Sequence, residues 1–125
     1  MGYRILFLFF TFVFFSCAST TSSSSKVVDD DYGYSENNPI KVGGPSNGPA
    51  NERKYLYSLT GLNGEQVTFV RKGSCCHFES KNAFGLGLLD VYEVQIKGDT
   101  VKKTLYLNMY DKDKLYAPKG FLMKK

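Results

Sequence analysis

Three consecutive residues, Cys75, Cys76 and His77, are the ones whose types best suit chemistry. Adjacent cysteines can close a vicinal disulfide, although their Cα atoms lie about 3.8 Å apart, closer than in ordinary disulfides. Thiolates and imidazole are also zinc ligands. A thiolate with a histidine base is the arrangement of a cysteine nucleophile. The fourth interpretation is structural, with the thiols buried as small apolar side chains.

The spacing of these residues favours two of the four interpretations. Zinc needs ligands that surround it, whereas Cys75, Cys76 and His77 are consecutive and the chain has no second histidine. Neighbours on a strand point to opposite faces, which separates a Cys76 nucleophile from a base at His77. A vicinal disulfide and plain burial are therefore favoured. Asp90 and Glu93 are likewise expected on opposite faces of one strand, so no catalytic carboxylate pair is predicted.

The N-terminus indicates the compartment in which these thiols reside. Arg4 precedes an apolar stretch over residues 5–15 that contains six phenylalanines. A basic start, a short apolar run and small residues before the cut are typical of a secretory signal peptide. The run is shorter than the roughly 20 residues that span a bilayer. We therefore predict a signal peptide over residues 1–16 and an exported protein, whose thiols meet an oxidising environment.

Cys17 directly follows this stretch, in the sequence Phe14-Phe15-Ser16-Cys17. This sequence resembles the bacterial lipobox, in which a small residue precedes a cysteine that becomes acylated. The resemblance implies cleavage before Cys17 and acyl chains such as palmitate on that residue, and several chains at one site anchor a protein firmly. Ala18 in place of Asp is similar to lipoproteins sorted to the outer membrane of a Gram-negative bacterium. The alternative is ordinary signal-peptidase cleavage, which leaves Cys17 a free thiol.

The chain after Cys17 divides into a tether and one small domain. Residues 19–25 are all serine or threonine and three aspartates follow, so residues 17–31 are predicted to form a disordered tether. Residues 32–125 are then available for a single globular domain. A helix is favoured over residues 51–59, which Gly61 would end, and an alternating strand is the alternative.

Apolar alternation predicts strands further along the chain. The expected strands are residues 39–42, 65–72, 88–97 and 101–110. Gly98-Asp99 is a two-residue loop of the favoured hairpin type, and it places Tyr92 opposite Leu105 and Asp90 opposite Leu107. The predicted fold is α+β, with an antiparallel sheet of three to four strands packed against one short helix and the tyrosine-rich segment that begins the domain.

The end of the chain is basic, because residues 102–125 hold seven lysines and two aspartates. The lysines are Lys102, Lys103, Lys112, Lys114, Lys119, Lys124 and Lys125. Such a surface suits lipid headgroups or acidic glycans, and the alternative is an ordinary solvated surface. Nucleic acid is not an expected partner, because an exported protein rarely meets it and no recognition motif is present.

Four blocks of the mature chain carry a wider resemblance. They are residues 32–44 (YGYSENNPIKVGG), 73–76 (GSCC), 88–94 (LLDVYEV) and 117–121 (APKGF). Together they resemble a family of small exported bacterial lipoproteins of unknown function, and the resemblance implies no active site. Some members are labelled 2-dehydro-3-deoxyphosphooctonate aldolase. A barrel of that kind needs roughly 250 residues, so a chain of 125 residues does not support aldolase activity.

The sequence as a whole predicts a membrane-anchored lipoprotein of the cell envelope. Its domain is expected to be a non-enzymatic binding or structural module, with another envelope protein or an anionic glycan or lipid as partner, and no cofactor is implied. One alternative is a thiol-active protein, either a redox sensor or a small hydrolase, that uses Cys75 and Cys76. Another is a metal-binding domain that uses Cys75, Cys76 and His77.

Overall fold

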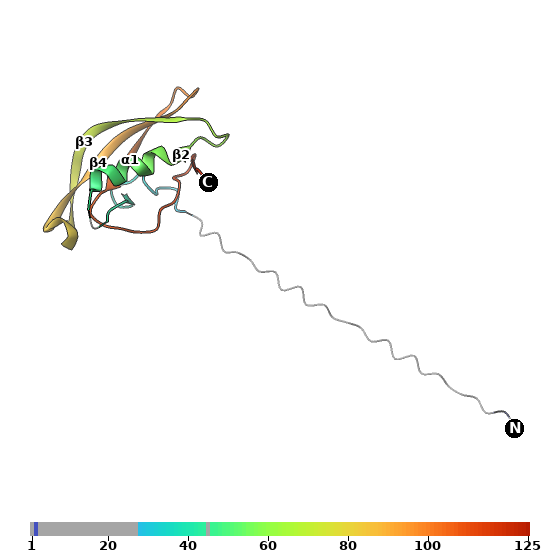
Figure 1. The fold of residues 1–125 in the computed structure, drawn as a ribbon, viewed down its shortest axis with the longest axis horizontal. Helices are drawn as coiled ribbons and strands as arrows, with labels where there is room; N and C mark the ends of the chain where they lie inside the picture. Colours follow the sequence, from blue (N-terminus) through green and yellow to red (C-terminus); the bar gives the residue numbers. More distant parts are fainter. Residues whose placement is uncertain (1, 3–27, 45) are drawn as a thin grey trace.

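The computed structural model in Figure 1 describes residues 28–44 and 46–125, together with Gly2. The predicted signal peptide, Cys17 and most of the predicted tether lie outside the described residues. The described elements are β1 (Ile40–Lys41), α1 (Gly48–Tyr57), β2 (Leu59–Thr60), β3 (Val67–Ser80), the 3-10 helix η1 (Lys81–Ala83), β4 (Gly85–Ile96), β5 (Lys102–Asn108) and β6 (Leu122–Met123). The predicted α+β class is confirmed for this part of the chain.

The main sheet has the strand order β1-β5-β4-β3, and β2 pairs with β6 in a separate two-stranded sheet. β3, β4 and β5 are antiparallel neighbours, as predicted. β1 instead runs parallel to β5, with Ile40 opposite Leu107, so the sheet is mixed rather than wholly antiparallel. Parallel pairing needs a long connection between the strands, and the whole stretch from α1 to β4 supplies it.

The β4–β5 hairpin has the predicted register. Tyr92 pairs with Leu105 and Asp90 with Leu107 across the strands. Gly98, in the connecting loop, has a φ of 89°, a left-handed conformation that glycine adopts without a Cβ penalty. Tyr92, Leu105 and Leu107 are buried together with Val94, which makes this face of the sheet the centre of the core.

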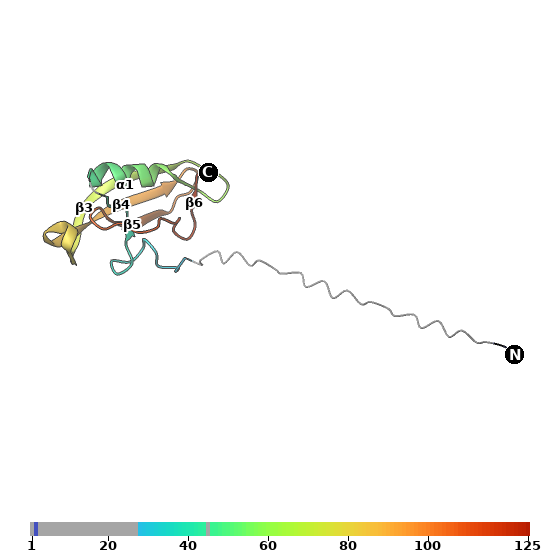
Figure 2. The same cartoon turned by 60° about the horizontal axis from the view of Figure 1, so that its bottom comes forward.

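Helix α1 covers that buried face, as the two views in Figures 1 and 2 agree. It begins at Gly48 and has a proline in its first turn, where the missing N–H costs nothing. It buries Glu52, Tyr55 and Leu56. The helix prediction for residues 51–59 is therefore confirmed as far as Tyr57, and the chain then turns into strand β2.

β3 is much longer than the eight residues predicted, because it continues through the cysteine pair to Ser80. Two register shifts, between Arg71 and Gly73 and between Cys75 and His77, absorb one extra residue each as β-bulges. β5 pairs with β4 only over residues 90–95. Residues 77–88 of the β3–β4 hairpin therefore project beyond β5, and we name this segment the β3–β4 arm (Figure 1).

Candidate functional site

Cys75 and Cys76 form a vicinal disulfide, which confirms one of the two favoured predictions. Their Cα atoms are 3.7 Å apart, below the range of ordinary disulfides. Cys76 is the extra residue of a bulge and has a φ of 59°. This left-handed conformation is unfavourable by about 1–3 kcal/mol for a residue with a side chain, so the surrounding strand must hold it in place.

The bulge at Cys76 decides where His77 lies. Cys75 pairs with Leu89, whereas His77 pairs with the adjacent residue Leu88. Consecutive residues of a strand point to opposite faces, so Cys75 and His77 lie on opposite faces of the sheet. The strand therefore separates the histidine from the sulfur atoms that it was proposed to assist.

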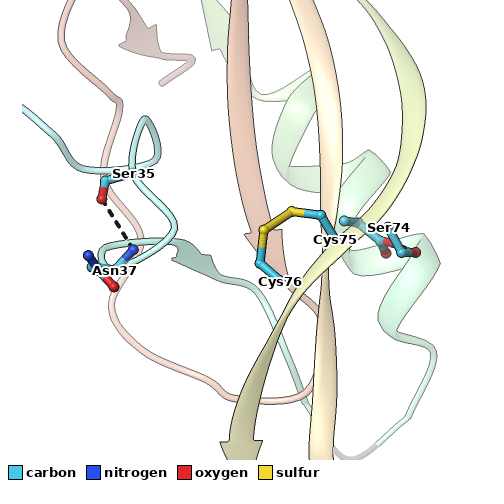
Figure 3. The surroundings of a disulfide bond; sticks show 6 residues. Ser35, Asn37, Ser74, Cys75 and Cys76 are labelled. Carbon is cyan, nitrogen blue, oxygen red and sulfur yellow. Dashed lines mark hydrogen bonds between the residues drawn. A yellow bond between two sulfur atoms is a disulfide. The ribbon is translucent and has the colours of Figure 1, made fainter.

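Glu36 is the residue that the fold brings to the disulfide. Its carboxylate and the two Sγ atoms all lie within 4.8 Å of one another. In Figure 3 the disulfide points from its strand toward the loop that carries Ser35 and Asn37, on the far side of the sheet from α1. Sequence reasoning missed this contact, because Glu36 and Cys75 are 39 positions apart in the chain and no local pattern relates them.

The loop that carries Glu36 is held by its own hydrogen bonds. The Asn37 amide donates to Ser35 Oγ over 3.2 Å, and the Asn38 amide donates to the Ser35 carbonyl over 3.1 Å. The Asn38 side chain donates to Asp31 Oδ1 over 2.9 Å. Glu36 is therefore an exposed carboxylate on a preformed turn, while both cysteines are half-buried beside it.

A second cluster of polar side chains lies beneath α1. Arg71 forms a 2.7 Å ion pair with Asp90 Oδ1, and Ser74 Oγ donates to the same oxygen over 2.9 Å. Tyr92 donates its hydroxyl proton to Glu52 Oε2 over 3.0 Å. Glu52 and Asp90 are only 1% and 2% exposed, so this cluster joins the helix to β3 and β4 inside the core.

The pKa of Glu52 is raised from 4.5 to about 8, chiefly by burial and secondly by the neighbouring Asp90 carboxylate. Glu52 is therefore protonated at neutral pH. Its Oε1 atom is buried and has no hydrogen-bond partner among the described residues. The sequence analysis, which considered Asp90 only together with Glu93, did not identify the proximity of Asp90 to Glu52.

The tip of the β3–β4 arm is apolar and exposed. Phe84 is fully exposed in a left-handed conformation with a φ of 55°, and Leu86 and Leu88 are 58% and 38% exposed. Phe84 and Leu86 lie at or next to the turn, whereas Leu88 lies at the base of the arm opposite His77, so exposed apolar side chains extend along the arm from its turn to its base.

The arm is fixed near its turn to the loop after β5. Asp111 Oδ1 accepts hydrogen bonds from Ser80 Oγ over 2.5 Å and from the Asn82 side chain over 3.0 Å. The hydrogen bond from Ser80 contributes most to lowering the pKa of Asp111 below its usual range. The hydrogen bonds from the Asn82 and Asn108 side chains lower it further. The Phe78 ring also lies 6.0 Å from the Tyr110 ring. The arm is thus anchored to the body of the domain.

The C-terminal lysines do not gather into one patch of free charge. Lys102 is 3.4 Å from Glu93, and Lys119 is 3.1 Å from Asp30. Lys103 lies over the Phe121 ring and Lys114 lies over the Tyr116 ring. Four of the seven lysines therefore contact partners within the chain, and binding of anionic surfaces by this region stays a prediction.

Comparisons with protein-family models, with curated proteins and with solved structures find no match for this chain. Among the described residues, no helix combines the length and the apolar character that crossing a membrane requires.

Proposed function

We propose that the chain is a lipoprotein of the cell envelope, anchored through Cys17, whose domain is a non-enzymatic module that binds another envelope protein. The lipobox and the tether sequence support the anchor. The observation that carries the binding role is the exposed apolar tip of the β3–β4 arm, with Phe84 at its end. Aromatic side chains, phenylalanine among them, are enriched at protein interfaces, where a few residues contribute most of the binding energy.

The arm suits a binding element because it is ordered before any partner arrives. Its turn is held by the hydrogen bonds that Ser80 and Asn82 donate to Asp111. A preformed element loses little conformational entropy on association, so more of the contact energy appears as affinity.

The position of the arm favours a partner protein over the membrane that holds the anchor. The turn of the arm and the segment at which the coloured ribbon begins lie toward opposite ends of the domain in both views (Figures 1 and 2). A chain tethered through residues 17–31 can therefore present Phe84 away from its own membrane.

Site-specific photocrosslinking in intact cells tests this function. A photoreactive phenylalanine analogue replaces Phe84, and the matched control carries it at Leu62, which is 61% exposed on the loop before β3. We expect a discrete protein adduct from position 84 and none from position 62. Equal labelling at both positions, or no adduct at position 84, contradicts the proposed role, and a lipid adduct transfers the assignment to a membrane surface.

The vicinal disulfide favours a second candidate function, a thiol redox sensor. Cys75 and Cys76 are joined and only half-buried, so a reductant can reach them. A small hydrolase is less supported, because the bulge places His77 on the other face from Cys75. Graded thiol–disulfide buffers, followed by alkylation and mass measurement, give the midpoint of reduction. A pair that stays oxidised in every buffer that leaves the domain folded contradicts the sensor role.

A further inference from the structure

Glu36 and the vicinal disulfide form a corner of the molecule whose side chains can bind a metal ion only after the disulfide is reduced. A disulfide sulfur is a poor metal ligand, whereas a thiolate is a strong one for soft and borderline cations. Reduction would replace one ring bond with two such ligands beside a carboxylate that the fold already supplies. This corner therefore differs from the consecutive set of Cys75, Cys76 and His77, in which every ligand comes from one strand.

We propose that the reduced pair of Cys75 and Cys76 forms, together with Glu36, a binding site for a thiophilic divalent cation such as Zn²⁺. A dithiol reductant supplies two electrons and two protons, so that the S–S bond breaks, two thiols form and the reductant becomes a disulfide. Zn²⁺ then displaces both thiol protons, which pass to water, and two Zn–S bonds form. The Glu36 carboxylate is the third protein ligand.

The spacing of the ligand atoms suits one ion. The carboxylate and both Sγ atoms already lie within 4.8 Å of one another. Zinc binds thiolate at about 2.3 Å and carboxylate at about 2.0–2.2 Å, so ligands of a tetrahedral site lie about 3.5–3.8 Å apart. Opening the disulfide lets the two sulfurs separate toward that distance, and Glu36 needs only a small side-chain movement on its preformed turn.

The ligands come from different segments of the fold and leave one coordination position open. Glu36 comes from the loop before β1, whereas the cysteines come from β3, so the ligands approach from two segments of the fold. Three protein ligands leave the fourth tetrahedral position to water, the arrangement of zinc sites that are not purely structural. Since only the reduced form holds thiolates, the site is gated by the redox state of the pair.

The test measures Zn²⁺ binding to the folded mature chain before and after reduction. The protein is treated with a phosphine reductant, desalted without oxygen and titrated with Zn²⁺ against a chromophoric chelator. Alkylation confirms that both thiols are free, and circular dichroism confirms the fold. Cd²⁺ serves as a second probe, because thiolate ligation produces an ultraviolet charge-transfer band. We expect one ion per reduced chain and none per oxidised chain.

Two variants assign the ligands. Glu36→Gln, at an exposed position that leaves the fold intact, is expected to weaken Zn²⁺ binding by roughly 10-fold or more. His77→Ala is the matched control and is expected to bind as the parent does. Absence of zinc binding by a folded, reduced chain overturns the proposal, as does equal binding by Glu36→Gln or failure of the pair to open without unfolding. None of these results depends on crosslinking at Phe84, so the two proposals fail separately.

Discussion

The buried carboxyl of Glu52 makes the stability of the domain depend on pH in a defined direction. Folding raises its pKa from 4.5 to about 8, because burial and Asp90 both disfavour the ionised form. Between these two values the folded chain holds a proton that the unfolded chain has released. The free energy of unfolding is therefore greatest below pH 4.5 with respect to this group, and it decreases as the pH rises toward 8.

The size of the effect follows from the interval between the two pKa values. The interval is about 3.5 pH units, and each unit corresponds to ~1.4 kcal/mol, which gives a loss of up to ~5 kcal/mol. Glu52→Gln removes the titration. Its amide oxygen still accepts from Tyr92, and an uncharged amide takes the place of the protonated carboxyl beside Asp90. The variant is therefore expected to match the parent near pH 4.5 and to exceed it increasingly up to pH 8.

Urea denaturation of both proteins at pH values from 5 to 9 measures this difference, and contributions from other groups cancel in the comparison. Glu79→Gln, which removes an exposed carboxyl of β3, is the matched control for the loss of one negative charge. A Glu52→Gln variant that is less stable than the parent by the same amount at every pH would refute the reasoning, because Glu52 would then be ionised in the folded chain.

Three further substitutions probe the rest of the framework. Arg71→Met leaves the buried carboxylate of Asp90 without its cation and is expected to cost ~2–3 kcal/mol in urea denaturation; an unchanged midpoint would contradict this. Asp111→Asn is expected to lower the free energy of unfolding by ~1 kcal/mol at pH 7. This difference from the parent should vanish at acid pH, because protonation of Asp111 weakens the same hydrogen bonds in the parent once the pH falls through its lowered pKa. Gly43→Ala places a Cβ 2.5 Å from the Tyr110 backbone, so we expect a loss of ~1–3 kcal/mol in thermal unfolding, and a neutral result would show that this loop yields.

Local patterns in the sequence were sufficient for the centre of the sheet. The Gly98-Asp99 loop has the length and composition of a tight hairpin, so it fixed the register of β4 and β5 without knowledge of the rest of the fold. The end of β3 could not be read in the same way. Bulges at Lys72 and Cys76 interrupt the alternation, although the strand itself continues to Ser80.

The two polar clusters differ in how visible they are in the sequence. Glu52 stands three, four and seven residues before Tyr55, Leu56 and Leu59, which is the spacing of one helix face. A helical-face analysis could therefore have found a carboxyl that must be buried. The contact of Glu36 with the disulfide depends on the path of a loop over the sheet, and no periodicity encodes such a path.

The anchor at Cys17 is the central claim of this account, and intact-mass spectrometry of the protein extracted from the membranes of an expressing Gram-negative bacterium tests it most directly. The account predicts a chain that begins at Cys17, carries the mass of its acyl chains and gains two hydrogen atoms on reduction of Cys75 and Cys76. A chain with an unmodified Cys17, or one that begins at another residue, would contradict it.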